Sequence, residues 1–177
     1  MPWNVLATSV EGRRDDLLAG LRRLAGFRPG GYRNVVVAQV DDPAALVDGV
    51  RAALGADARL AGALARLVPL DVHVRFEQPT AIDTFTAAAE PLLDRLAGKS
   101  FFVRLERRGM KGRLHSPTIE REIGGRLWRT LESRGHTPRV EFRDPDVVLV
   151  IETLGDQAGI GAIDRALRET FPFVKVR

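Results

Sequence analysis

Short runs of β-branched and aromatic residues alternate along this chain with longer stretches rich in alanine and leucine. The runs 34–40 and 147–153 are almost continuously apolar, as in strands buried on both faces. Residues 70–76 and 101–106 alternate apolar and polar side chains, which is typical of a strand with one buried face. In the segment 13–24 the leucines recur at helical spacing. The pattern favours a mixed α/β (α+β) fold over a helix bundle.

The order of these signals predicts the elements of the fold. We expect strands at 4–10, 34–40, 70–76, 101–106, 139–142, 147–153 and 173–176, and helices at 13–24, 43–54, 79–96, 116–133 and 162–170. Residues 28–32 and 155–161 are expected to be a turn and a glycine-containing connection, and 56–66 stays open between a short helix and a loop. Ser116 is a good N-cap for its helix, with Pro117 in the first turn.

The composition allows one domain or two small ones. The chain has 177 residues, 45% of them hydrophobic, and a weak division falls near residues 77–80. We expect one unit at residues 1–78 and another at 79–177. Cysteine is absent, which excludes disulfides, thiolate zinc sites and cysteine nucleophiles. No apolar run approaches the roughly 20 residues of a membrane span, so we expect no membrane contact and a cytoplasmic protein.

Positive charge is concentrated between Lys99 and Arg143. This segment holds twelve basic and five acidic residues, a net charge of +7, whereas the rest of the chain carries −3. Like charges repel one another in a compact chain, so a folded domain that keeps such an excess usually presents it to a polyanion or another acidic partner.

The segment 107–115 is the most basic loop of that region. Arg107, Arg108, Lys111 and Arg113 lie within it beside two glycines. Guanidinium groups fork onto phosphate oxygens, and glycine permits close approach of a ligand backbone. The loop therefore predicts a phosphate-binding surface, and a solvated turn is the alternative.

Other candidate chemistry is sparse. Gly124 and Gly125 fall inside a predicted helix, where close packing against the sheet is one explanation and access for a nucleic-acid backbone another. The three histidines are isolated in the sequence. His115 adjoins the basic loop, and a surface or capping histidine is the alternative to an RNA contact there. No phosphate-binding glycine motif, nucleophile elbow or metal-ligand spacing is present, so we expect no catalytic residue, cofactor or metal.

Three segments follow one another in the second half of the chain: FFVRLERRG at 101–109, SPTIEREIG at 116–124 and DPDVVLVIE at 144–152. In this order and spacing they make residues 80–161 resemble a THUMP domain, an RNA-binding module of tRNA-modifying proteins. Residues 4–9 and 68–71 resemble the ferredoxin-like unit that accompanies THUMP, and 162–177 add a predicted helix and strand. The resemblance implies a ferredoxin-like unit followed by a THUMP domain.

The resemblance also implies a function. The chain resembles THUMP-only proteins, which bind the acceptor end of tRNA and serve a separate cytidine N4-acetyltransferase without catalysis of their own. The expected RNA contacts are Arg104, Arg107, Arg108, Lys111, Arg113, His115, Arg121 and Arg129. Changing Arg107 and Arg108 together should weaken RNA binding and leave thermal stability nearly intact. The alternative is a small enzyme or ligand-binding α/β protein whose basic face takes an acidic metabolite or protein.

Overall fold

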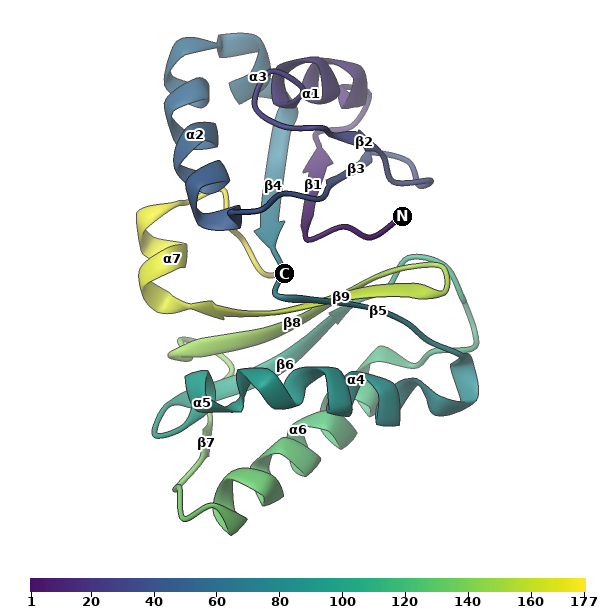
Figure 1. The fold of residues 1–177 in the computed structure, drawn as a ribbon, viewed down its shortest axis with the longest axis vertical. Helices are drawn as coiled ribbons and strands as arrows, with labels where there is room; N and C mark the ends of the chain where they lie inside the picture. The colour runs from purple at the N-terminus through teal and green to yellow at the C-terminus, as the bar shows by residue number, and fades with distance from the viewer. The chain divides into compact units, whose positions relative to one another are not determined.

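The computed structural model describes residues 1–177, which divide into two compact units (Figure 1). Residues 1–70 and 168–175 form the first unit, and residues 71–167 and 176–177 form the second. The division precedes the boundary expected at residue 78, because residues 72–75 pair with the second sheet. The sequence predicts that the C-terminal segment extends the second unit. In the structure, residues 168–175 belong to the first unit instead.

The first unit has the βαββαβ order of a ferredoxin-like fold. Its elements are β1 (Val5–Ser9), α1 (Arg14–Leu21), β2 (Arg28–Pro29), β3 (Val35–Ala38), α2 (Pro43–Ala56), α3 (Ala58–Ala63) and β4 (Leu64–Pro69). The strands are antiparallel in the order β2-β3-β1-β4, with Leu6 opposite both Val37 and Val68. Helix α2 begins as predicted, because the Asp42 carboxylate accepts a hydrogen bond from the Ala45 amide at 3.0 Å.

Three segments of this unit differ from the sequence prediction. Residues 28–29, expected in a turn, form the short strand β2. The stretch left open at 56–66 contains helix α3 and the start of β4, whose Arg66 is 1% exposed. Residues 173–176 form no strand, because only one backbone hydrogen bond, from the Leu67 amide to the Phe173 carbonyl, ties this segment to β4.

The second unit is a five-stranded mixed sheet with helices on one face. Its elements are β5 (Val72–Arg75), η1 (Gln78–Thr80), α4 (Ala81–Ala89), η2 (Glu90–Leu92), α5 (Leu93–Leu96), β6 (Ser100–Glu106), α6 (Ser116–Ser133), β7 (Arg139–Val140), β8 (Val147–Leu154), β9 (Gln157–Asp164) and α7 (Arg165–Thr170), which crosses the division between the units. The strand order is β5-β9-β8-β6-β7, and β6 runs parallel to both of its neighbours.

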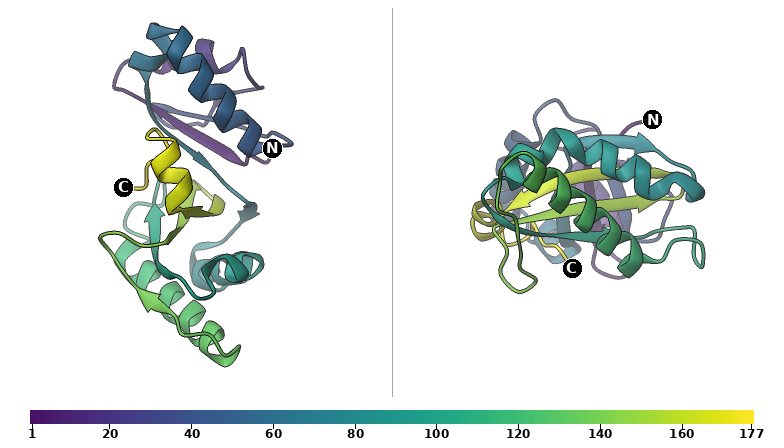
Figure 2. Two further views of the ribbon diagram at one scale, coloured as in Figure 1. Left: turned by 90° about the vertical axis from the view of Figure 1, so that its left-hand side faces the viewer. Right: turned by 90° about the horizontal axis from the view of Figure 1, so that it is seen from below.

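Helices α4 and α6 lie side by side on this sheet (Figures 1 and 2). Ile119, Ile123, Leu127 and Leu131, the stripe expected from helical spacing, are all buried on α6. They join one apolar core with alternate residues of the central strands, such as Val103 on β6. The strand β6 and the helix α6 are thereby fixed as a rigid frame for the loop between them.

The second unit also departs from the prediction in three places. Pro91 interrupts the helix expected at 79–96, since proline cannot continue the helical hydrogen bonds, and the segment is split into α4, η2 and α5. The glycine-containing stretch 155–161 is mostly β9, paired with both β5 and β8. Helix α6 is capped by His115 and begins with Ser116, whereas the sequence assigned the cap to Ser116.

Candidate nucleic-acid interface

The basic loop, residues 107–115, connects β6 to α6 and is anchored at its first residues. The Arg108 amide donates to the Thr153 hydroxyl at 3.0 Å, and the Gly155 amide donates to the Arg108 carbonyl at 2.9 Å. Beyond this anchor the backbone reverses with positive φ at Gly109, Met110 and Gly112. Glycine adopts that region without steric cost, so the tight loop depends on the two glycines that the sequence placed there.

Arg108 does not point its charge freely into solvent. Its Nη1 lies 2.6 Å from an Oε2 of Glu152, and the two side chains are 16% and 1% exposed. The guanidinium thus forms a buried ion pair with Glu152 on β8, and this pair holds the start of the loop against that strand. The structure places Arg108 apart from the other predicted contacts, as a structural residue.

The remaining cations of the loop are more accessible. Lys111 and Arg113 are exposed and have no acidic partner. Arg107 is half-buried, and its Nη1 donates to the Gly109 carbonyl at 3.0 Å, a contact that leaves its charge uncompensated. These three side chains gather on one short loop, as predicted from their spacing.

His115 has a structural role that the sequence only hinted at. Its Nδ1 lies 2.7 Å from the Thr118 hydroxyl and accepts a hydrogen bond from the Thr118 amide at 3.4 Å. The imidazole therefore caps the first turn of α6. Its ring is exposed at the junction of the basic loop and the helix, beside Arg113.

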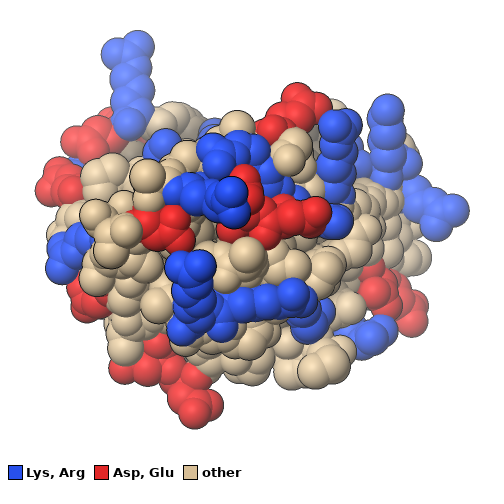
Figure 3. Space-filling model, turned by 90° about the horizontal axis from the view of Figure 1, so that it is seen from above, with Lys and Arg blue, Asp and Glu red and all other residues tan.

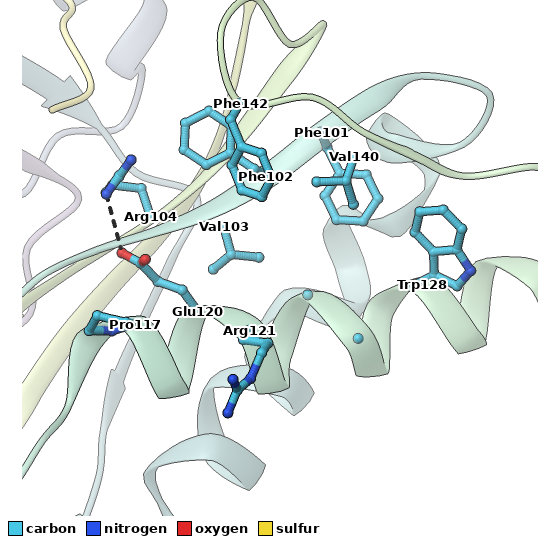
Figure 4. Close-up of a pocket in the computed structure, with 12 residues that line it drawn as sticks. Phe101, Phe102, Val103, Arg104, Pro117, Glu120, Arg121, Trp128, Val140 and Phe142 are labelled. Atoms are coloured by element: carbon cyan, nitrogen blue, oxygen red, sulfur yellow. Dashed lines mark ion pairs between the residues drawn. The ribbon is translucent and has the colours of Figure 1, made fainter.

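A groove of about 380 Å³ runs beside the loop, between α6 and the outer edge of β6 (Figure 4). Its walls are β6 from Phe101 to Arg104, the α6 residues between Pro117 and Trp128, and Val140 and Phe142 from the segment beginning at β7. Sequence reasoning did not identify this β6–α6 groove, because its residues come from three separate segments. Phe142 is 72% exposed, a high value for so large an apolar side chain, and this exposure is visible only in the structure.

Two predicted contacts line the groove, and a third lies nearby on α6. Arg104 lies with its Nη1 3.8 Å from a carboxylate oxygen of Glu120 and its guanidinium carbon 5.3 Å from the centre of the Phe102 ring. Arg121 and Arg129 are exposed on α6, and Figure 4 shows Arg121 projecting away from β6. Arg104 and Arg121 thus line the groove, Arg129 lies further along α6, and Arg108 is held in its ion pair with Glu152.

The first unit presents a different distribution of charge. Figure 3, which looks onto its helices, shows basic and acidic side chains interleaved. Arg23 is 3.2 Å from Asp57, and Arg33 is 2.9 Å from Glu11. Amide hydrogen bonds from Leu60 and Arg59, assisted by the charge of Arg23, hold the pKa of Asp57 below its usual value. These cations have acidic partners, whereas Lys111 and Arg113 of the second unit have none.

Metal-binding and membrane-spanning features are not found. No cluster of three or more histidine, aspartate or glutamate side chains could hold a metal ion. None of the helices has the length and apolar character needed to cross a bilayer.

These features define the class of the protein. It is a mixed α/β protein of two sheets, with a cation-bearing loop and a groove on the second sheet. Residues 80–162 match the family model of the THUMP domain, so the chain contains that domain, as its sequence resemblance implied. The tRNA sulfurtransferase of Citrobacter koseri is 40% identical to this chain over 75 residues. That match covers 42% of this chain and only 14% of the sulfurtransferase.

Solved structures share the fold of both units. TrmN from Thermus thermophilus matches with a TM-score of 0.64 and 25% identity, over 89% of this chain and 44% of TrmN. A 4-thiouridine synthetase, solved in a complex with RNA and bound ATP, matches with a TM-score of 0.60 and 15% identity, over 92% of this chain and 41% of the synthetase. The chain thus spans less than half of either solved chain.

Proposed function

We propose that this chain binds tRNA through the basic loop and the adjoining face of α6. The observation that carries the proposal is that Lys111 and Arg113, exposed and without acidic partners, lie inside a THUMP domain. The similarity of the chain to a tRNA sulfurtransferase and to a synthetase that was solved with bound RNA supports the proposal. Charge on a fixed loop suits a structured RNA, whose phosphates are spaced by its A-form helix.

The contacts fall into two kinds. Arg107, Lys111 and Arg113 neutralise phosphates from the loop, and Arg121 and Arg129 do so from α6. Arg108 is left out of this set, because its guanidinium is held by Glu152. His115 lies between the two groups and is placed to pack against a sugar or a base.

We further propose that the chain presents tRNA, by its acceptor end, to a separate modification enzyme and catalyses nothing itself. A tRNA cytidine N4-acetyltransferase is the enzyme that the sequence resemblance favours. The support is that sequence resemblance. The one carboxylate of the groove, Glu120, accepts a hydrogen bond from the Leu105 amide and lies 3.8 Å from Arg104, and the His115 imidazole caps α6.

Binding is tested by titrating the chain with full tRNA, with tRNA lacking its 3′ end, and with heparin. We expect full tRNA to bind most tightly, and a preference for heparin would favour the alternative of an acidic metabolite or protein ligand. The variant Lys111→Ala/Arg113→Ala should weaken tRNA binding about tenfold or more, whereas exposed Lys99→Ala, at the other end of β6, should change it little.

The adaptor role needs a separate experiment. A purified tRNA acetyltransferase is assayed for N4-acetylcytidine by mass spectrometry, with and without this chain. Formation of the product only when both proteins are present supports the proposal. Formation by the enzyme alone at the same rate, or modification of tRNA by this chain alone, contradicts it.

A further inference from the structure

The β6–α6 groove has a floor that is open because two side chains are missing. Gly124 and Gly125 line it in the middle of an eighteen-residue helix, where glycine weakens the helix. A Cβ at Gly124 would lie 3.8 Å from the Val103 Cγ2, and one at Gly125 would lie 3.5 Å from the Arg129 Nη1. Both distances are ordinary contacts, so packing against the sheet does not require glycine here. The open floor of the groove is then the remaining explanation for glycine at these two positions.

The walls of the groove offer flat apolar surface. Phe142 is 72% exposed and Val140 is 46% exposed, while Trp128 is half-buried at one end. The Phe142 ring packs on Phe102, with centroids 5.8 Å apart. Figure 4 shows this aromatic pair across the groove from α6. Exposed aromatic side chains around a cavity usually mark a binding surface.

A single hydrogen-bonding position is open at the back of the groove. Strand β7 covers the outer edge of β6 only at Ser100 and Phe101, and the Leu105 amide donates to Glu120 at 2.8 Å. Because backbone groups of alternate residues face the same edge, Val103 presents its N–H and C=O there. One open residue is too short for a peptide strand to pair with the sheet, but it matches the hydrogen-bonding edge of a base.

The charge beside the groove complements a nucleotide. Arg121 lies at its rim with no acidic partner, and Arg104 lies at its end towards the basic loop. The one lining carboxylate, Glu120, is engaged by the Leu105 amide and by Arg104. Phosphates on either side of an inserted base would therefore meet cations.

We propose that the β6–α6 groove receives an unpaired nucleobase of the bound RNA, which stacks between the aromatic wall and the glycine floor. This inference rests on the proposed function, since the basic loop holds the RNA that supplies the base. It assigns the groove to reading single-stranded RNA, while the loop binds phosphates without regard to pairing.

The test uses the full chain and two short RNA hairpins, one blunt-ended and one with a single-stranded overhang that carries 2-aminopurine. We expect the overhang to tighten binding about tenfold and the 2-aminopurine emission to fall on binding, as stacking on an aromatic ring predicts. Phe142→Ala and Gly124→Ala should abolish most of this preference and leave binding of the blunt hairpin unchanged. Val10→Ala, which alters an exposed apolar residue of the first unit, is the matched control and should keep the preference.

The outcomes separate the two proposals. If both hairpins bind equally well to the unaltered chain, the groove proposal is overturned and tRNA binding by the loop stands. If the preference for the overhang survives in Phe142→Ala and Gly124→Ala, the base binds elsewhere and the groove proposal is again wrong. If neither hairpin nor tRNA binds, the proposed function itself fails.

Discussion

Arg107 and Arg108 are neighbours in the sequence but differ in what surrounds their guanidinium groups. Arg108→Ala would remove the guanidinium that lies 2.6 Å from the Glu152 carboxylate, which is 1% exposed. Breaking a buried pair on one side typically costs about 3–5 kcal/mol, so we expect that loss in the free energy of unfolding. Arg107→Ala removes only a contact to the Gly109 carbonyl and should cost less than about 1 kcal/mol. Urea unfolding followed by circular dichroism measures both.

The double variant provides the control for that measurement. Arg108→Ala/Glu152→Gln removes the buried charge as well as its partner and should recover part of the lost stability. Equal and small effects of Arg107→Ala and Arg108→Ala would show that the ion pair is not structural. The sequence predicts that both arginines can be removed at little cost to stability. The structure predicts this for Arg107 alone and predicts a large loss of stability for Arg108→Ala.

Asp146 gives the fold a dependence on pH. The Ser100 amide, 2.8 Å from its Oδ2, and the Ser100 hydroxyl hold the pKa of Asp146 below its usual value, and Arg165 and Arg139 add to the effect. A carboxyl whose pKa is lowered by folding stabilises the fold above its unfolded pKa of 3.8, and this contribution is lost as the pH falls through the folded pKa. Asp146→Asn should unfold more readily than the unaltered chain at pH 7, and the difference should shrink below about pH 4. A difference that stays constant from pH 7 to pH 3 would contradict this assignment.

Single residues were the hardest part of the site to predict from the sequence. Lys111 and Arg113 were identified correctly as exposed cations of a glycine-containing loop, because short spacing and local turn chemistry suffice for that. The pairing of Arg108 with Glu152 joins residues 44 positions apart, and no local pattern reveals it. The role of His115 as a helix cap was visible only as one of two alternatives.

At the scale of elements, α6 offers a direct test of why it contains two glycines. Since a Cβ fits at both positions, Gly124→Ala and Gly125→Ala should each raise the free energy of unfolding by about 1 kcal/mol, the difference in helix propensity. Gly20→Ala in α1 is the contrasting control, because its Cβ would lie 2.7 Å from the Leu60 Cδ1 and should destabilise the fold. Thermal and urea unfolding of the three variants distinguish these cases. Destabilisation by Gly124→Ala would restore close packing as the reason for the glycine.

The type of an element was predictable where its periodic pattern was long. The prediction was wrong where the amino-acid composition of the segment was typical of another kind of element. The stripe of α6 and the alternation of β6 were sufficient to place both elements almost to the residue. Strand β9 was missed because Gly159 and Gly161 are typical of loops, although in the structure both pair with β8. Strand β4 was obscured by alanines and by Arg66, a charged side chain buried within it.

At the scale of the whole molecule, the two comparisons cover different amounts of the chain. The THUMP model covers residues 80–162, whereas the fold of TrmN matches 89% of the chain. Arg23 and Arg33 of the first unit have acidic partners, whereas the exposed Lys111 and Arg113 of the THUMP domain have none. If Lys111 and Arg113 bind RNA phosphates, as proposed, the tRNA affinity should depend on salt concentration in a specific way.

Each phosphate that a cation neutralises releases counterions from RNA. With roughly four to six phosphates engaged, the logarithm of the tRNA affinity should fall against the logarithm of the salt concentration with a slope of about −3 to −5. Lys111→Ala/Arg113→Ala should make that slope shallower by about 2, whereas Lys99→Ala should leave it unchanged. Fluorescence anisotropy of labelled tRNA over a series of potassium chloride concentrations measures the slopes. A flat profile for the unaltered chain would remove the RNA hypothesis, and an unchanged slope in the double variant would place the phosphate contacts outside the basic loop.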